Sequence, residues 1–96
     1  MTVELIAQDG IAMDSTSVIN REVPIPYYYQ LEGLLRQQIM HGRWQAGQRV
    51  PSEKQLCEFY AVSRTTVRQA VNNLVDEGLL YHVKGKGTFV RKRANV

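Results

Sequence analysis

The chain has 96 residues and a formal net charge of +3, which is unevenly distributed: residues 1–26 carry −3 and residues 27–96 carry +6. We expect such a compact cationic domain to bind a polyanion, which would be nucleic acid, with a membrane surface as the other candidate. No run of about 18 apolar residues and no signal peptide is present, so we expect one small cytoplasmic domain without a membrane partner.

Residues 1–23 show no helical periodicity. Asp9-Gly10, between two short apolar runs, hints at a hairpin, but an isolated hairpin is marginally stable in water. We therefore expect residues 1–23 to form a flexible, mildly acidic arm ahead of the folded domain.

A first helix is predicted to start just after Pro26 and to end at Gly42. Its apolar face would consist of Tyr28, Leu31, Leu34, Leu35 and Ile39. The run Tyr27-Tyr28-Tyr29 could stack on bases. At helical spacing only one or two of the three can face solvent, which favours packing instead. Trp44 is expected to plug the edge of the core, and Arg49-Val50 to pair with a later hairpin.

A second helix is predicted from Ser52, which can form a capping box with Gln55. After a short turn, Ser63 can cap a third helix of about residues 63–77. Its apolar stripe is Val67, Ala70, Val71, Leu74 and Val75, and its opposite face carries Arg64, Thr65, Arg68, Gln69 and Asn72. Two such helices joined by a tight turn form a helix-turn-helix, here spanning Glu53 to Asn72. The polar face fits a recognition helix in a major groove, although a solvated surface would show the same pattern.

The segment from about residue 79 to residue 91 is predicted to be a hairpin. Leu79-Val83 and Thr88-Val90 are strand-like, and Lys84-Gly85-Lys86-Gly87 is a basic turn between them. A glycine at the tip allows close approach to a phosphate or a groove floor. Directly after a recognition helix such a hairpin is a wing, and the alternative is an ordinary surface hairpin with solubilising lysines.

Enzymatic and metal chemistry have no recognisable site. Cys57 is the only cysteine, so no internal disulfide can form, and its place beside Leu56 favours packing over nucleophilic catalysis. His41 and His82 lack further ligands at suitable spacing, so we expect no metal and no cofactor. Gly85-Lys86-Gly87 lacks both the Gly-Lys-Ser/Thr ending and the strand-to-helix context of a nucleotide-binding P-loop. The chain is predicted not to be an enzyme.

At this point the sequence resembles a known family. The residues that carry the resemblance are Gly42-Arg43-Trp44, Gly47, Pro51-Ser52-Glu53, Leu56, Tyr60, Val62-Ser63-Arg64, Thr66-Val67-Arg68-Gln69-Ala70, Leu74, Glu77-Gly78-Leu79-Leu80 and Gly85-Lys86-Gly87-Thr88-Phe89-Val90. Together they resemble the winged helix-turn-helix domain of GntR-type bacterial transcription regulators, and Pro26-Tyr27-Tyr28-Tyr29-Gln30-Leu31 is most similar to the HutC-like subgroup. The resemblance covers residues 24–93.

The resemblance implies a mostly α fold, with a three-helix core and a small β-hairpin wing over residues 24–93. It implies sequence-specific binding of double-stranded operator DNA by a metabolite-responsive repressor. The DNA-contact positions would be Lys54, Arg64, Thr65, Thr66, Arg68, Gln69, Lys84, Gly85 and Lys86. Residues 94–96 would begin a linker to a C-terminal effector-binding domain, through which the full-length protein forms a homodimer on DNA.

Two other functions fit the pattern less well. A winged helix can bind an acidic protein partner, but the face from Arg64 to Gln69 shows no apolar patch for such contact. Binding of single-stranded RNA would need exposed aromatic residues on a strand face, and Tyr81 and Phe89 are expected to be partly buried. The sequence itself specifies neither the operator nor the effector.

Overall fold

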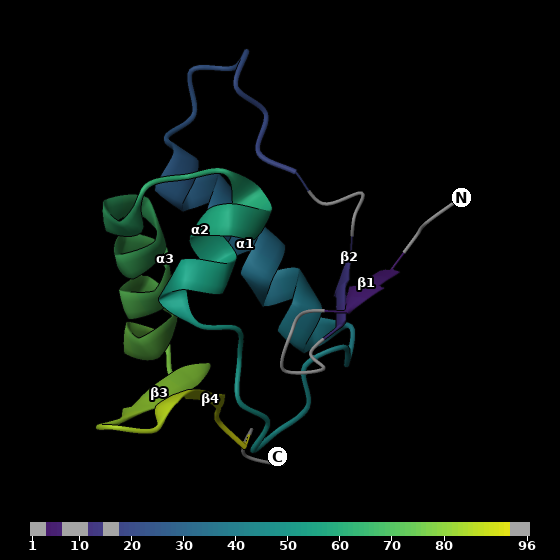
Figure 1. The fold of residues 1–96 in the computed structure, drawn as a ribbon, viewed down its shortest axis with the longest axis vertical. Coiled ribbons are helices and arrows are strands. Elements are labelled where there is room, and N and C mark those ends of the chain that lie inside the picture. Colours follow the sequence, from purple (N-terminus) through teal and green to yellow (C-terminus); the bar gives the residue numbers. More distant parts are fainter. Residues whose placement is uncertain (1–3, 7–11, 15–17, 93–96) are drawn as a thin grey trace.

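The computed structural model describes residues 4–6, 12–14 and 18–92, in which three helices are followed by a two-stranded hairpin (Figure 1). The elements are β1 (Glu4–Ile6), β2 (Ala12–Asp14), α1 (Tyr27–Met40), α2 (Glu53–Tyr60), α3 (Arg64–Asp76), β3 (Leu80–Val83) and β4 (Gly87–Val90). The α1 helix packs against α3, α2 joins α3 through a tight turn, and the β3–β4 hairpin follows α3 directly. The predicted three-helix core with a wing is confirmed.

Two serine side chains fix where α2 and α3 begin. The Ser52 hydroxyl accepts a hydrogen bond from the Gln55 backbone amide at 3.1 Å, and the Gln55 side chain accepts one from the Ser52 amide at 2.8 Å. This is the predicted capping box. The Ser63 hydroxyl likewise accepts from the backbone amide of Thr66 at 3.1 Å. Each bond satisfies an amide that has no partner within its helix.

Replacing the first of these caps should cost measurable stability. We expect Ser52→Ala to lower the free energy of unfolding by about 1 kcal/mol, because it removes the hydroxyl that accepts from the Gln55 amide, although the Ser52 backbone amide can still donate to the Gln55 side chain. Ser52→Thr keeps a hydroxyl and is the matched control. Urea denaturation of the 96-residue chain measures the difference. Equal midpoints for Ser52→Ala and the unchanged chain would show that the box does not stabilise α2.

The end of α3 directs the chain into the hairpin. Gly78 has a φ of +81°, and the amide of Leu79 donates to the carbonyl of Leu74 at 3.0 Å, which closes the last turn as a Schellman motif. The strands then pair in antiparallel register, with Leu80 opposite Val90. On the other edge of β4, Arg49 forms an isolated bridge with Phe89, as predicted for the Arg49-Val50 segment.

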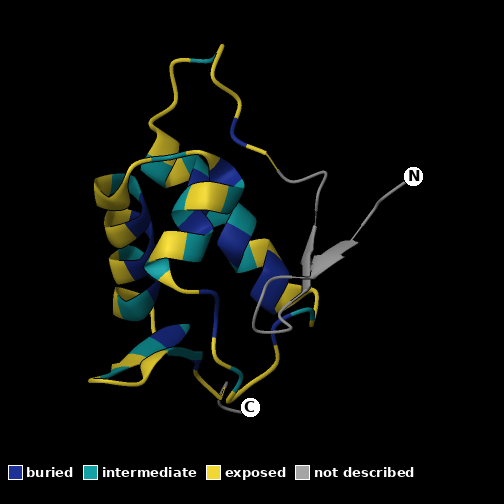
Figure 2. Cartoon of the chain, in the orientation of Figure 1, coloured by how far each residue is buried: buried dark blue, intermediate teal, exposed yellow. Residues whose placement is uncertain are grey.

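The core lies where the three helices meet the inner face of the hairpin (Figure 2). Its residues all have exposed fractions of 8% or less: Ile19, Leu31, Leu35, Ile39, Trp44, Val50, Leu56, Tyr60, Val67, Ala70, Val71, Leu74, Leu80 and Val90. Trp44 is 1% exposed, in agreement with its predicted role. Because Leu80 and Val90 belong to the hairpin, the hairpin is packed onto the same core as α3.

The segment before α1 also contacts this core. Ile19 is buried, and the backbone amide of Asn20 donates to the side chain of Gln30 on α1 at 2.7 Å. Contacts with the helical core therefore begin before residue 24, within the expected flexible arm of residues 1–23. Strands β1 and β2 pair with Leu5 opposite Met13, as the hinted hairpin requires. Residues 1–3, 7–11 and 15–17, including the Asp9-Gly10 turn, lie outside the described residues.

The three consecutive tyrosines of α1 differ in their exposure to solvent. Tyr27 and Tyr29 have exposed fractions of 37% and 65%, whereas Tyr28 is half-buried. The guanidinium carbon of Arg21 lies 5.1 Å from the centroid of the Tyr27 ring. Two of the three rings thus face solvent, the upper limit that helical spacing predicted.

Candidate nucleic-acid interface

One side of α3 packs on the core and the other is open to solvent. Val67, Ala70, Val71 and Leu74 are buried, while Arg64, Thr65, Arg68, Gln69 and Asn72 are exposed (Figure 2). The amphipathic division predicted from the sequence is therefore present. From Arg64 to Val75 the helix has no acidic residue, so its exposed face is cationic and rich in hydrogen-bond donors.

Two arginines on this face share one carboxylate from the preceding helix. Arg68 donates to Glu53 from Nε to Oε2 at 2.6 Å and from Nη2 to Oε1 at 3.2 Å, and Nη1 of Arg64 lies 3.6 Å from Glu53 Oε1. The arginine side chains are 63% and 64% exposed. The hydrogen bond to Glu53 raises the pKa of the Arg68 guanidinium above its ordinary value. Glu53 thus fixes the direction in which Arg68 points without burying it.

The geometry of this ion pair leaves Arg68 able to bind a second group. Glu53 takes the Nε edge of the guanidinium, and a guanidinium has five N–H donors. The N–H groups on Nη1 and the second one on Nη2 are not used by Glu53. These two nitrogens form the end-on fork that matches the O6 and N7 acceptors of guanine.

Two of the predicted contact residues are partly engaged within the protein. The Thr66 hydroxyl accepts a hydrogen bond from the Ser63 hydroxyl at 3.0 Å, so it belongs to the cap of α3. The Gln69 side chain donates to Asn73 at 2.9 Å, and Asn73 donates to Glu32 of α1 at 2.8 Å. Gln69 is therefore exposed but linked through Asn73 to α1, and Thr65 and Lys54 are exposed as well.

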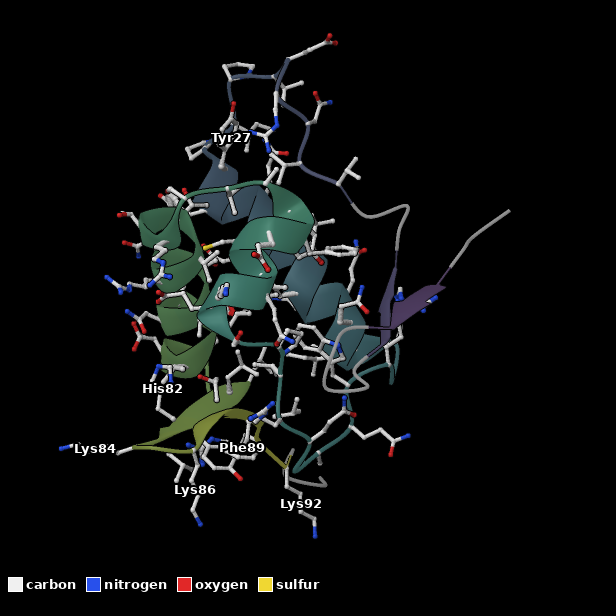
Figure 3. All side chains as sticks on the ribbon, in the orientation of Figure 1. Tyr27, His82, Lys84, Lys86, Phe89 and Lys92 are labelled. Carbon is white, nitrogen blue, oxygen red and sulfur yellow. The ribbon has the colours of Figure 1, made fainter. Side chains whose placement is uncertain are left out.

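The tip of the hairpin carries the remaining predicted residues. Lys84, Gly85 and Lys86 form its turn, closed by a hydrogen bond from the Lys86 amide to the Val83 carbonyl at 2.9 Å. Gly85 has a φ of +78°, a conformation that L side chains rarely adopt, and an added Cβ would meet no atom within 4 Å. Figure 3 shows Lys84 and Lys86 extending from the tip into solvent, in different directions.

A cleft of about 260 Å³ separates α3 from the hairpin. Its apolar floor includes Val50, Leu56, Val67 and Val71, and its polar rim includes Ser52, Glu53, Arg68, Asn72, His82, Lys86 and Thr88. The cleft thus connects the exposed face of α3 with the tip of the wing.

His82 bridges the two walls of this cleft. Its Nδ1 lies 2.8 Å from the Thr88 hydroxyl on β4, and its Nε2 lies 3.3 Å from the side-chain oxygen of Asn72 on α3 (Figure 3). Sequence reasoning missed the place of His82 and Thr88 in this site. The signal was available, because strand alternation places His82 on the same face as the buried Leu80, which faces α3.

Among the described residues, the other reactive side chains do not assemble into a catalytic or metal-binding site. Cys57 is partly buried against the core, and burial raises the pKa of its thiol, which disfavours the nucleophilic thiolate. Within residues 4–6, 12–14 and 18–92, no group of three or more His, Cys, Asp or Glu is arranged to hold a metal ion. No helix in the described part of the chain is long and apolar enough to cross a membrane.

Comparison with known proteins identifies the family. The family model described as bacterial regulatory proteins, gntR family, matches residues 27–90, which covers α1, α2, α3 and the wing. The chain belongs to the gntR family. Since this is a family of regulatory proteins, the prediction that the chain is not an enzyme is confirmed.

Among curated relatives, the chain is 53% identical over 74 residues to the HTH-type transcriptional repressor NagR of Bacillus subtilis. That match covers 77% of this chain and 30% of NagR. The histidine utilization repressor of Klebsiella aerogenes is 39% identical over 70 residues, covering 73% of this chain and 29% of the relative, consistent with the HutC-like resemblance. The chain thus spans about 30% of the length of these relatives.

Solved structures give the same family and fold. The AraR DNA-binding domain in complex with operator ORX1 matches with a TM-score of 0.72 and 37% identity, covering 76% of this chain and 93% of that one. YtrA from Sulfolobus acidocaldarius, a GntR-family transcription factor, matches with a TM-score of 0.72 and 30% identity, covering 79% and 80%.

Proposed function

We propose that this chain is the operator-binding part of a bacterial transcriptional repressor and binds double-stranded DNA sequence-specifically. The observation that carries the proposal is the exposed face of α3, where Arg64 and Arg68 are oriented by Glu53 beside a wing with two lysines at its tip. Support comes from the similar AraR domain, which was solved in complex with an operator, and from NagR, which is named a repressor.

In this proposal α3 enters the major groove. Arg64, Thr65 and Arg68 are exposed along one side of the helix and carry donors that suit base edges or adjacent phosphates. Thr66 and Gln69 contribute from the cap and from the flank toward α1. Arg68 is the residue we assign to guanine, because its end-on fork is left open by Glu53.

The wing and the cleft would bind the sugar-phosphate backbone beside that groove. Lys84 and Lys86 at the tip, and Lys54 on α2, suit phosphates as mobile point charges. The cleft lies between the helix proposed for the major groove and the wing proposed for the minor groove, so the strand that separates the two grooves would run along it. The side-chain NH2 group of Asn72 on its wall would then donate to a phosphate oxygen, while His82 holds the oxygen of the same side chain.

In the full-length protein, we expect dimerisation and metabolite control to be added to DNA binding. We propose that it acts in the cytoplasm and binds as a homodimer to a palindromic site, each copy contacting one half-site. We also propose that a C-terminal domain binds a metabolite that changes operator affinity, since NagR is about three times as long as the matched part.

Salt dependence of DNA binding tests the proposal. The 96-residue chain is expected to bind a random duplex weakly and a site selected from a randomised library at least about tenfold more tightly. The plot of log K against log salt should have a slope of about −3 or steeper if the three lysines contact phosphates. If the chain does not bind duplex DNA even at low salt but binds an acidic protein, the proposal is wrong and the domain is a protein-interaction module.

A further inference from the structure

A short segment before α1 closes over the turn between α2 and α3. It comprises residues 19–22, which we call the N-terminal clasp. Arg21 donates from Nη2 to the backbone carbonyls of Tyr60, at 3.0 Å, and Ala61, at 2.5 Å. These contacts join parts of the chain about 40 residues apart, and Figure 1 shows the segment at the same end of the domain as the α2–α3 turn.

The two carbonyls lie at the C-terminal end of α2. Tyr60 is the last residue of α2, and Ala61 is its C-cap, with a φ of +54° and a ψ of +50°. Carbonyls at a helix end have no partner within the helix, and a cation there also interacts favourably with the helix dipole. A non-glycine residue in the left-handed region costs free energy, so this conformation needs support from its surroundings. Arg21 provides that support.

The rest of the clasp is fixed on the opposite side, to α1. The Gln30 side chain accepts from the Asn20 amide at 2.7 Å and donates to the carbonyls of Asn20 and Ile25, both at 2.9 Å. Ile19 is buried in the core, and the guanidinium of Arg21 lies over the ring of Tyr27. The clasp therefore holds the end of α2 relative to the start of α1.

The position of the turn determines where α3 begins. Ala61 and Val62 are followed at once by Ser63, which caps α3, and by Arg64, Thr65 and Thr66. We propose that Arg21 is a positioning residue for DNA recognition: it holds the α2–α3 turn so that the first turn of α3 meets the major groove at a fixed angle. Arg21 acts through Ala61 and does not itself touch DNA.

DNA binding by Arg21→Ala gives the first test, and this readout rests on the proposed function. At a temperature where circular dichroism shows the variant folded, we expect affinity for the selected site to fall about 3- to 10-fold. Affinity for random duplex and the salt slope should stay unchanged, and Arg21→Lys should recover most of the loss. A reduced salt slope would mean that Arg21 contacts phosphate, and an unchanged affinity would mean that it only stabilises the fold; either result overturns the proposal.

Amide hydrogen exchange tests the clasp independently of DNA. In Arg21→Ala, exchange at the hydrogen-bonded amides of Val62, Thr66 and Val67 should accelerate, while exchange at Leu35 in the core should not. Gln30→Ala releases the other side of the clasp and should give the same local pattern, so it replaces Arg21→Ala if that variant does not fold. Uniform acceleration at all these sites, or none at Val62, Thr66 and Val67, would overturn the proposal even if the domain binds DNA as expected.

Discussion

Arg68→Ala is expected to reduce the preference for the selected site over random duplex about 5- to 150-fold, with the fold intact. The guanidinium is the group assigned to guanine, and its side chain is 63% exposed and points away from the core. Glu53 orients it, so the free protein already presents the fork in one direction. Competition binding with labelled selected and random duplexes measures the ratio directly.

Arg68→Lys provides the matched control for this result. Lysine keeps the positive charge but lacks the planar fork, so it should retain affinity for random duplex and still lose most of the preference. If Arg68→Ala keeps the original preference, Arg68 does not contact a base. If the lysine variant keeps it, the contribution of Arg68 is charge alone, and the guanine assignment is wrong.

The second large effect is expected at the tip of the wing. Gly85→Val should weaken binding to the selected site about tenfold or more, because a β-branched residue is strained at a φ of +78°. The added Cβ itself meets no protein atom within 4 Å. The defect would therefore come from the backbone of the turn and from contact with DNA, not from crowding within the domain.

Lys86→Ala separates charge from geometry at the same tip. This variant keeps the turn and removes one cation, so affinity should fall alike for selected and random duplexes, and the salt slope should become shallower by about 0.9. Gly85→Val should reduce the slope at least as much, since both lysines would lose their phosphates, and should weaken specific binding more. Binding by Gly85→Val equal to that of the unchanged chain would show that the wing does not touch DNA.

The elements of the fold could be predicted because their signals are local. The capping box of Ser52 and Gln55, the apolar stripe of α3 and the glycine-containing turn of the wing each depend on residues a few positions apart. Helical and strand periodicity then fixes which side chains enter the core. The bridge at Arg49 could also be anticipated, because Arg49 and Val50 immediately precede a predicted helix start.

The contacts that orient the candidate site depend on tertiary structure instead. Glu53 and Arg68 are 15 residues apart on different helices, and Arg21 is 39 residues from Tyr60. No sequence periodicity links such pairs, so the sequence pattern predicts a flexible arm for the N-terminal segment and does not reveal its contacts with the end of α2. Gln69 lies on the polar face, as predicted. Its bond to Asn73 is a local contact four residues along α3, whereas the bond from Asn73 to Glu32 depends on the packing of α1 beside α3.

The segment around Arg49, which bridges to β4, also bears on the energetics of DNA binding. The Val50 amide donates to Thr88 and the Val90 amide donates to Gln48, both at 2.9 Å, so one wall of the cleft continues directly into the start of α2. The spacing between wing and recognition helix is thus set before any ligand arrives, and little conformational entropy is lost on association. We therefore expect the duplex to do most of the adjusting, so that base steps that bend or narrow easily would be favoured even where no side chain reaches a base.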